Sequence, residues 1–322
     1  MLFAFHKQLL YDSIEVMKMI VTDEVIHSYL NQCKKRKNLS NKTIKAYTID
    51  LYQFKDFMKE KECTKENLNS YFDELYQRYE KPKTVKRKIA VIRALFNYLS
   101  YEDLIEHNPF DKIRIQFKEP KILPRTIHMN NMIDIIKLAY EKIEQSDTEY
   151  KKNTAIRDAT IIELLFSTGI RVSELCNIKN TDIDLDSREL LIYGKGAKER
   201  MLQIGNDSVI MALKTYETIY HTAIEETGYF FLNKNKKRLS EQSVRILLNK
   251  FENEIGMDQH ITPHMFRHTF ATQLLEEDVD IRYIQKILGH SSISTTQIYT
   301  HVSSTKQKEI LVMKNPRNMI KL

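Results

Sequence analysis

The chain has 322 residues, of which 42% are hydrophobic and 29% are charged, while glycine and proline number only 7 and 6. This composition is typical of a helix-rich globular protein of about two domains, and it excludes a disordered or fibrous chain. The net charge is +7 and the pI is near 9.0. Such an excess reflects either a lysine-rich solvated surface or, where the charges cluster, a polyanionic partner.

The cysteines and the N-terminal residues indicate the cellular compartment in which the protein is expected. The cysteines are far apart and odd in number, which indicates free thiols in a reducing cytoplasm rather than a disulfide framework or a zinc site; they are Cys33, Cys63 and Cys176. No apolar run has the length of a membrane span, so we expect no membrane partner. Residues 1–22 form an N-terminal extension without signal-peptide features, whose role the sequence leaves open. We expect a surface helix there, or a start at Met17 or Met19.

Residues 23–111 are predicted to form a helical domain. Ser40 or Asn41 can cap one helix, and Thr64 and Thr84 can start a second and a third. Each helix has an apolar stripe at helical spacing, made of Ile44, Tyr47, Leu51, Phe54 and Met58, then Leu68, Phe72, Leu75 and Tyr79, then Val85, Ile89, Ile92, Phe96 and Leu99. Asn108-Pro109 ends the pattern, because a residue before proline disfavours helical angles.

Basic residues cluster in this domain, both in residues 34–37 and along the predicted helices. Cations at helix starts oppose the helix dipole, so a purely structural motive for them is weak. We therefore predict a footprint for a nucleic-acid backbone, with a solvated face as the alternative. The candidate DNA-binding residues are Lys42, Lys45, Lys83, Lys86, Arg87 and Arg93.

Residues 112–127 contain Pro120 and Pro124 among charged residues, which predicts a stiff, extended linker. Residues 128–322 then form a second domain. Two basic domains joined by such a linker would close on a rod-like ligand as a C-shaped clamp.

The second domain is predicted to be mixed α+β, so that the whole chain is mainly α with a small antiparallel β-hairpin or sheet. Two β-prone runs, 189–193 and 200–204, flank a glycine-rich turn with Lys195 at its tip. The other predicted elements are helices at 130–144, 155–167, 207–225 and 240–255, a turn at Thr168-Gly169 followed by a short amphipathic segment at 171–175, and a strand at 229–233.

Residues 262–268 combine a helix start with side chains that suit a phosphate. Thr262 can cap a helix with Pro263 at its first position. His264 then lies in the first turn, where free backbone N–H groups favour anions. Arg267 lies on the same face, and a guanidinium can grip two phosphate oxygens. Taken singly, these two side chains also fit a packed surface histidine and an ordinary ion pair.

A metal site at these histidines is not expected. His268 follows His264 by four residues, but the HExxH motif needs a glutamate where Met265 stands.

A second helix end follows. Asp280 can cap a helix over 281–288, in which Ile281, Ile284, Ile287 and Leu288 are expected to be buried. Gly289 ends this helix, so His290 sits at a forced turn. Ser294 or Thr295 can start a short helix that carries Tyr299, although a lone tyrosine is usually a core residue.

Taken together, the motifs are specific. In chain order they are Arg171-Val-Ser-Glu-Leu175, Gly194-Lys-Gly196 with Lys198 and Arg200, His264-x-x-Arg267-His268, Leu288-Gly-His290 and Tyr299. This series closely resembles the tyrosine recombinases, or phage-type integrases, and within them the compact Xer-like branch. Phe270-Ala-Thr-Gln-Leu-Leu275 and the stretch 289–302 carry the likeness to that branch, and Ser40-x-x-Thr43-x-x-x-Tyr47 with Asp50-Leu51 is similar to the family's SAM-like core-binding domain.

The resemblance implies a site-specific DNA recombinase without a cofactor or metal. Tyr299 would be the nucleophile that forms a 3′-phosphotyrosine link. Arg171, Arg267 and His290 would hold the phosphate oxygens, Lys195 would protonate the departing 5′ oxygen, and His264 would act in general acid–base transfer. Glu174 would orient Arg171 or His264, and Lys198 and Arg200 would contact DNA. A phenol with a pKa near 10 needs such neighbours to react at neutral pH.

The family resemblance further implies a tetramer on two DNA sites, formed by this chain alone or with a paralogue. Its C-terminal segment would dock on a neighbour, and Ile310, Leu311, Val312 and Met313 offer an apolar patch for that contact or for packing within the chain. Four functions stay open: a recombinase that integrates a mobile element or resolves chromosome or plasmid dimers, a topoisomerase-like nicking and resealing enzyme, a non-catalytic DNA-binding regulator, and a metal nuclease. The DNA target and any accessory proteins are not readable from the sequence.

Overall fold

The computed structural model describes residues 21–59, 61–113, 125–194, 199–289 and 304–320. The chain divides into two compact units, Met1–Ile122 and Leu123–Leu322. The prediction of a mainly helical fold with a small antiparallel sheet is confirmed. Among the described residues, every helix is too short or too polar to cross a membrane.

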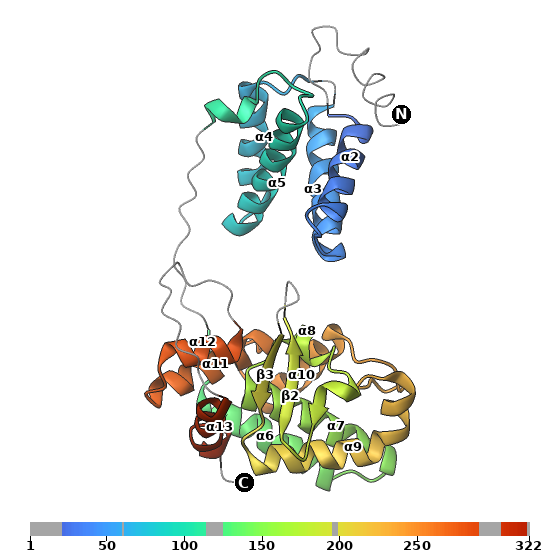
Figure 1. The fold of residues 1–322 in the computed structure, drawn as a ribbon, viewed down its shortest axis with the longest axis vertical. Helices are drawn as coiled ribbons and strands as arrows, with labels where there is room; N and C mark the ends of the chain where they lie inside the picture. The colour runs from blue at the N-terminus through green and yellow to red at the C-terminus, as the bar shows by residue number, and fades with distance from the viewer. Residues whose placement is uncertain (1–20, 60, 114–124, 195–198, 290–303, 321–322) are drawn as a thin grey trace. The chain divides into compact units, whose positions relative to one another are not determined.

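The first unit is a bundle of helices (Figure 1). Its elements are α2 (Asp23–Lys35), α3 (Asn41–Met58), α4 (Lys65–Arg78), α5 (Pro82–Tyr101) and the short 3-10 helix η1 (Pro109–Lys112). Ser40 caps α3 by accepting from the Thr43 N–H, and Thr64 caps α4 by accepting from the Asn67 N–H. Both predicted starts are therefore confirmed.

The predicted start of α5 at Thr84 is wrong. This helix begins at Pro82, because proline has its φ angle fixed near the helical value and lacks only an N–H that the first turn leaves unpaired. The core of the unit consists of apolar residues from all four helices and η1, with Phe96 packed on Phe110 at 5.4 Å between ring centroids.

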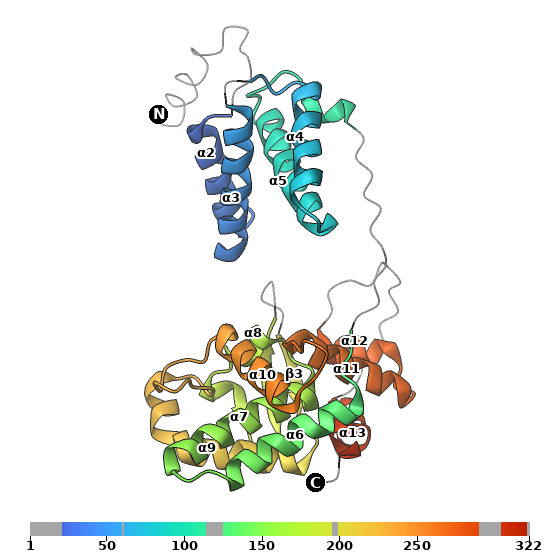
Figure 2. The same cartoon turned by 180° about the vertical axis from the view of Figure 1, so that it is seen from behind.

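The second unit carries the sheet. Its strands are β1 (Ile183–Asp184), β2 (Glu189–Tyr193) and β3 (Glu199–Gln203), all antiparallel in the order β1-β2-β3. The helical elements are α6 (Met129–Glu144), α7 (Glu149–Thr168), α8 (Val172–Leu175), η2 (Asn180–Asp182), α9 (Asp207–Thr227), α10 (Glu241–Ile255), α11 (Pro263–Glu276), α12 (Ile281–Leu288), α13 (Ser304–Met313) and η3 (Pro316–Met319). Figure 2 shows α6 on the side of the unit away from β2 and β3.

Helix α7 is the central element of this unit. It packs against α6, α9 and α11, and its C-terminal half is buried on all sides. It ends at Gly169, whose φ of +60° is in the left-handed region that favours glycine. A Cβ there would also lie 2.5 Å from the Phe270 ring. The end of the most buried helix thus fixes where Arg171 leaves the core.

Three sequence predictions for this unit are corrected. Helix α7 begins at Glu149, ahead of the predicted Ala155, because Thr148 caps it. Residues 229–233 form no strand: Tyr229 and Leu232 make only isolated bridges, and Leu232 donates its N–H to the Tyr216 hydroxyl. Ile281 is 54% exposed, since it stands at the first position of α12 before the helix reaches the core.

The C-terminal segment packs on its own unit. Ile310 and Leu311 are buried, whereas Val312 and Met313 are exposed, so the predicted apolar patch divides into an inner and an outer half. Beyond it, the buried Arg317 donates to both carboxylate oxygens of Glu163, at 2.6 and 2.7 Å. This ion pair ties η3 to α7.

Candidate active site

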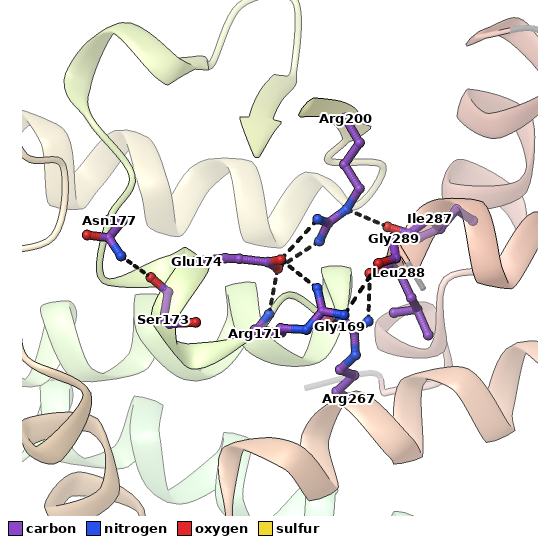
Figure 3. Close-up of polar contacts among 10 residues, drawn as sticks. All are labelled: Gly169, Arg171, Ser173, Glu174, Asn177, Arg200, Arg267, Ile287, Leu288 and Gly289. Carbon is purple, nitrogen blue, oxygen red and sulfur yellow. Dashed lines mark hydrogen bonds and ion pairs between the residues drawn. The ribbon is translucent and has the colours of Figure 1, made fainter. Parts of the chain in front are cut away.

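Arg171 begins the site at the N-terminal end of α8. Its backbone N–H donates to Glu174 Oε2 at 2.9 Å, and its guanidinium donates to Glu174 Oε1 at 2.7 Å. The carboxylate of the first turn therefore holds both the main chain and the side chain of one arginine (Figure 3). The Arg171 side chain is 31% exposed, so part of it faces solvent.

Arg200 reaches the same carboxylate from β3. Its two terminal nitrogens donate to the two oxygens of Glu174, at 3.0 and 2.7 Å, and its Nε donates to the Ile287 carbonyl at 2.9 Å. This paired geometry is the strong form of an arginine–carboxylate contact. Glu174 thus lies between two arginines from different elements, as Figure 3 shows.

Arg267 lies deeper, on α11, and is 5% exposed. It donates to the Gly169 carbonyl at 2.8 Å and to the Leu288 carbonyl at 2.6 Å. Burial, and then the positive charges of Arg171 and Arg200 against the attraction of Glu174, lower the pKa of Arg267 to about 10. The side chain therefore remains a cation at neutral pH.

The three arginines converge on the C-terminal end of α12. The consecutive carbonyls of Ile287, Leu288 and Gly289 accept from Arg200, Arg267 and Arg171 respectively, the last at 3.4 Å. A helix C-terminus presents carbonyls without intrahelical partners and a partial negative charge, both of which cations satisfy. The end of α12 is therefore the common anchor of the site.

Charge at this anchor is unbalanced. Burial alone would raise the pKa of Glu174, but hydrogen bonds from Arg200 and from the Arg171 N–H outweigh it, and the pKa lies below its ordinary value. Glu174 is thus ionised at neutral pH and offsets one of the three guanidinium charges. The surplus of positive charge in a partly buried site suits an anion such as a phosphate.

The histidines of α11 differ in exposure. His264 is exposed in the first turn, and His268 is half-buried. Burial, followed by the charges of His264 and Arg267, lowers the pKa of His268 below 6.5, so its imidazole is neutral at pH 7. Pro263 opens the helix as predicted, but the Thr262 side chain makes no capping hydrogen bond.

The structure brings Arg171, Glu174, Arg267 and Arg200 together. Four predicted residues lie outside the described residues: Lys195, Lys198, His290 and Tyr299.

Family models and individual relatives agree on what the chain is similar to. Residues 137–306 match the phage integrase family, and residues 26–103 match the phage integrase N-terminal SAM-like domain. A tyrosine recombinase of Agathobacter rectalis is 52% identical over 295 residues, which cover 91% of this chain and 96% of that protein. Tyrosine recombinase XerC of Bacillus subtilis is 32% identical and covers 87% and 92%.

The chain belongs to the tyrosine recombinase family. The sequence-based prediction of a site-specific recombinase of the Xer-like branch is confirmed, and the relatives do not favour the alternative functions. Solved structures show the same fold: XerH recombinase bound to a palindromic difH substrate has a TM-score of 0.65 at 21% identity, covering 91% of this chain and 90% of that one. A lambda integrase dimer bound to a COC′ core site has a TM-score of 0.63 at 16% identity, covering 86% and 99%.

In this tyrosine recombinase, the predicted basic footprint of the first unit lies on exposed positions. Lys42 and Lys45 are on α3, and Lys83, Lys86, Arg87 and Arg93 recur at helical spacing along α5. Both helices begin at the same end of the unit (Figure 1). Some of these cations also have protein partners: Arg87 pairs with Asp50, and Arg93 lies over the Phe110 ring at 5.5 Å.

Sequence reasoning placed Arg200 among the DNA contacts of the recombinase and missed its position within the arginine cluster. The positions of apolar residues along the strand could have indicated this. Leu202 and Ile204 are buried, and side chains two residues apart on a strand share a face, so Arg200 faces inward with them. Its cross-strand partner, Ile192, is buried as well.

Proposed function

We propose that this recombinase cuts and rejoins double-stranded DNA through a 3′-phosphotyrosine link at Tyr299. One observation supports the proposal above others: Arg171 and Arg267, from elements far apart in the sequence, meet at the end of α12, directly before His290 in the chain. Two guanidinium groups in a partly buried site match the charge that develops on a phosphate under attack.

Cleavage is a transfer of the phosphoryl group from one oxygen to another. The phenolic oxygen of Tyr299 attacks the scissile phosphorus, a P–O bond to tyrosine forms, and the bond to the 5′ oxygen breaks. Arg171 and Arg267 hold the non-bridging oxygens, with His290 as a third donor. Because the number of phosphoester bonds is unchanged, rejoining needs no ATP.

Two protons must move in this step. His264 accepts the phenol proton, directly or through water, and Lys195 gives a proton to the departing 5′ oxygen. In the reverse step a 5′ hydroxyl of the partner strand attacks the phosphotyrosine, and Tyr299 recovers its proton. Glu174 does not react and keeps Arg171 in place.

A covalent capture tests this function without a known target. The full chain is incubated in EDTA with sheared genomic DNA of its source organism, and protein-linked fragments are recovered and sequenced. The shared sequence then gives a nicked suicide duplex that traps the adduct. We expect an adduct that Tyr299→Phe abolishes, with a 5′ hydroxyl end that polynucleotide kinase labels directly. An adduct that persists in Tyr299→Phe, or none on any fragment, would contradict the proposal.

The same capture separates the two biological roles. Recovered sites confined to one chromosomal or plasmid locus would indicate dimer resolution, and sites at the ends of a repeated element would indicate integration.

The domain roles follow from the same proposal. Residues 23–111 bind DNA through the basic residues of α3 and α5, residues 112–127 link the units, and residues 128–322 carry the chemistry, with Lys198 as a further contact. All three cysteines are free and buried, which fits a reducing cytoplasm.

We also propose that the enzyme works as a tetramer on two DNA sites. A lambda integrase solved as a tetramer bound to a Holliday junction has the same fold at 17% identity and a TM-score of 0.63. Since Ile310 and Leu311 are buried in their own unit, docking on a neighbour falls to Val312 and Met313, which are 41% and 72% exposed. Val312→Asp with Met313→Asp should lower the mass of the DNA complex in light scattering, and an unchanged mass would contradict this contact.

A further inference from the structure

Arg200 is held by protein groups on every side that the structure describes. Each of its three guanidinium nitrogens donates a hydrogen bond, two to Glu174 and one to the Ile287 carbonyl. Its side chain is 12% exposed, compared with 31% for Arg171. Among the described residues, all three guanidinium nitrogens of Arg200 have a protein acceptor, whereas the contacts of Arg171 and Arg267 use two side-chain nitrogens of each.

Gly289 adapts the end of α12 to this guanidinium. Its φ of +65° is in the left-handed region, and a Cβ there would lie 3.0 Å from one terminal nitrogen of Arg200 and 3.2 Å from its Cδ. These distances are tighter than ordinary contacts. The missing side chain therefore lets the helix end approach Arg200 closely.

Arg200 consequently joins three separate parts of the fold. It belongs to β3, which follows residues 195–198 in the chain, and it contacts the carboxylate of α8 and the last turn of α12. Glu174 in turn holds the main chain and guanidinium of Arg171. A displacement of Arg200 would reach Arg171 through Glu174, and Gly289 through Ile287.

We propose that Arg200 is a positioning residue of the recombinase, which fixes Glu174 and the C-terminal end of α12 so that Arg171 is held for the phosphate. This inference rests on the proposed function, because it assigns a further residue to the same reaction. Arg200 itself does not contact DNA.

The first test separates positioning from DNA contact. Arg200→Gln and Arg200→Lys are compared with Arg188→Gln, an arginine whose partner is the exposed Asp207 outside the site. Single-turnover adduct formation is measured on the nicked duplex recovered with the wild-type chain. Arg200→Gln should slow cleavage about 10- to 100-fold, because small misplacements of a reacting constellation cost this much. The affinity for the same duplex and its salt dependence should match the wild type.

The second test asks whether Arg200 acts through Glu174. In a double-mutant cycle, residues in one network give non-additive effects. Arg200→Gln should therefore slow cleavage by a Glu174→Gln enzyme much less than it slows cleavage by the wild type. The remaining loss of rate would come from the missing hydrogen bond between Arg200 and the Ile287 carbonyl.

The pH profile gives a reading that a purely structural role would not change. The charged groups that face Glu174 among the described residues are Arg171, Arg200 and Arg267. Without Arg200, Glu174 keeps its burial but loses a hydrogen-bonded cation, so its pKa rises. The part of the acid limb of cleavage that Glu174 causes should then move to higher pH in Arg200→Gln, move less in Arg200→Lys, and be absent in the Glu174→Gln background, where any limb caused by another group remains.

The outcomes are decisive in both directions. A salt slope reduced by about one phosphate contact, with normal cleavage at saturating DNA, would make Arg200 a DNA contact and overturn the proposal. Additive effects with Glu174→Gln would overturn the route through Glu174. Thermal unfolding checks that the variants fold. If Arg200→Gln does not fold, Arg200→Lys serves as the test variant, because it keeps the positive charge but cannot donate from two nitrogens to both oxygens of Glu174. If the wild-type chain forms no adduct, the proposed function itself is contradicted. If the wild type forms an adduct and only the Arg200 results differ from expectation, the role of Arg200 alone is contradicted.

Discussion

The two units of this recombinase each bury one carboxylate between two cations, and they use it differently. In the first unit Asp50 is fully buried and accepts from Lys88 Nζ at 2.8 Å and from Arg87. In the second unit Glu174 accepts from Arg171 and Arg200.

The two sites differ in how many hydrogen bonds their cations can still donate to a ligand. Lys88 is 3% exposed, and its ammonium donates to Asp50 and Gln53 and lies 4.9 Å from the centre of the Tyr79 ring, so its described contacts all lie within its own unit. A guanidinium has five N–H groups, and the described contacts of Arg171 and Arg267 use two side-chain nitrogens of each. A cation whose nitrogens all have protein acceptors, such as Lys88 or Arg200, belongs to the fold, whereas an arginine with a side-chain nitrogen that the described contacts leave unused can bind a ligand.

The largest expected effect is on the stability of the first unit. It concerns the cluster of Asp50, Lys88, Gln53 and the Tyr79 ring, called the closed cluster below. Asp50→Ala leaves Lys88 charged and buried, and removing one partner of a buried pair costs about 3–5 kcal/mol. Hydrogen exchange within the full chain should show this loss in α3 and α5 and not in α7. The matched variant, Asp50→Leu with Lys88→Met, should recover the protection, because it removes both charges. Unchanged exchange in Asp50→Ala would show that this cluster does not hold the unit together.

Arg267→Gln should have the next largest effect, on chemistry. Loss of one preorganised donor to a developing oxyanion costs about 10²- to 10³-fold in rate. Single-turnover cleavage reports this loss, while affinity for the suicide duplex should change only a few-fold. Arg245→Gln, at an exposed helical ion pair, is the control. A cleavage rate within a few-fold of wild type would exclude Arg267 from the phosphate clamp.

Glu174→Gln should have a smaller effect that depends on pH. A hydrogen bond to a charged group contributes about 1.5–3 kcal/mol, so cleavage should fall about tenfold or more. Because the folded-state pKa of Glu174 is lowered, its contribution is present above the ordinary glutamate pKa and is lost as pH falls through the lowered value. The variant should therefore lose the acid limb that this group causes in the wild type. A wild-type limb that persists in Glu174→Gln belongs to another group.

Local features of the fold were readable from the sequence because their causes are local. Ser40, Thr64 and Asp280 cap the helices that the sequence predicted, since a cap depends on the next few residues. The predicted start of α5 at Thr84 was wrong for an equally local reason, because Pro82, two residues earlier, begins the helix. The strand predicted at 229–233 was wrong because a strand needs continuous pairing, and the composition of these residues could not reveal that they form only isolated bridges with Lys179 and Arg238.

The site was readable only in part. Motif order and family resemblance brought Arg171, Glu174 and Arg267 forward, but no spacing shows that Arg267 donates to carbonyls at Gly169 and Leu288. Those contacts depend on how α7, α11 and α12 pack. The buried Lys88 was likewise indistinguishable from its exposed neighbours on α5, because its burial is set by Asp50 on another helix.

The smallest expected effect tests the exposed cations beside that closed cluster. Lys45 and Lys83 are exposed on α3 and α5, and a contact with one phosphate contributes about 0.9 to the slope of log affinity against log salt. The Lys45→Gln and Lys83→Gln double variant should therefore lower the slope by about two and weaken binding at moderate salt, with cleavage at saturating DNA unchanged. Lys214→Gln, at an exposed pair in the second unit, is the control. If the slope stays at the wild-type value, these lysines are a solvated face, and the first unit grips DNA by other means.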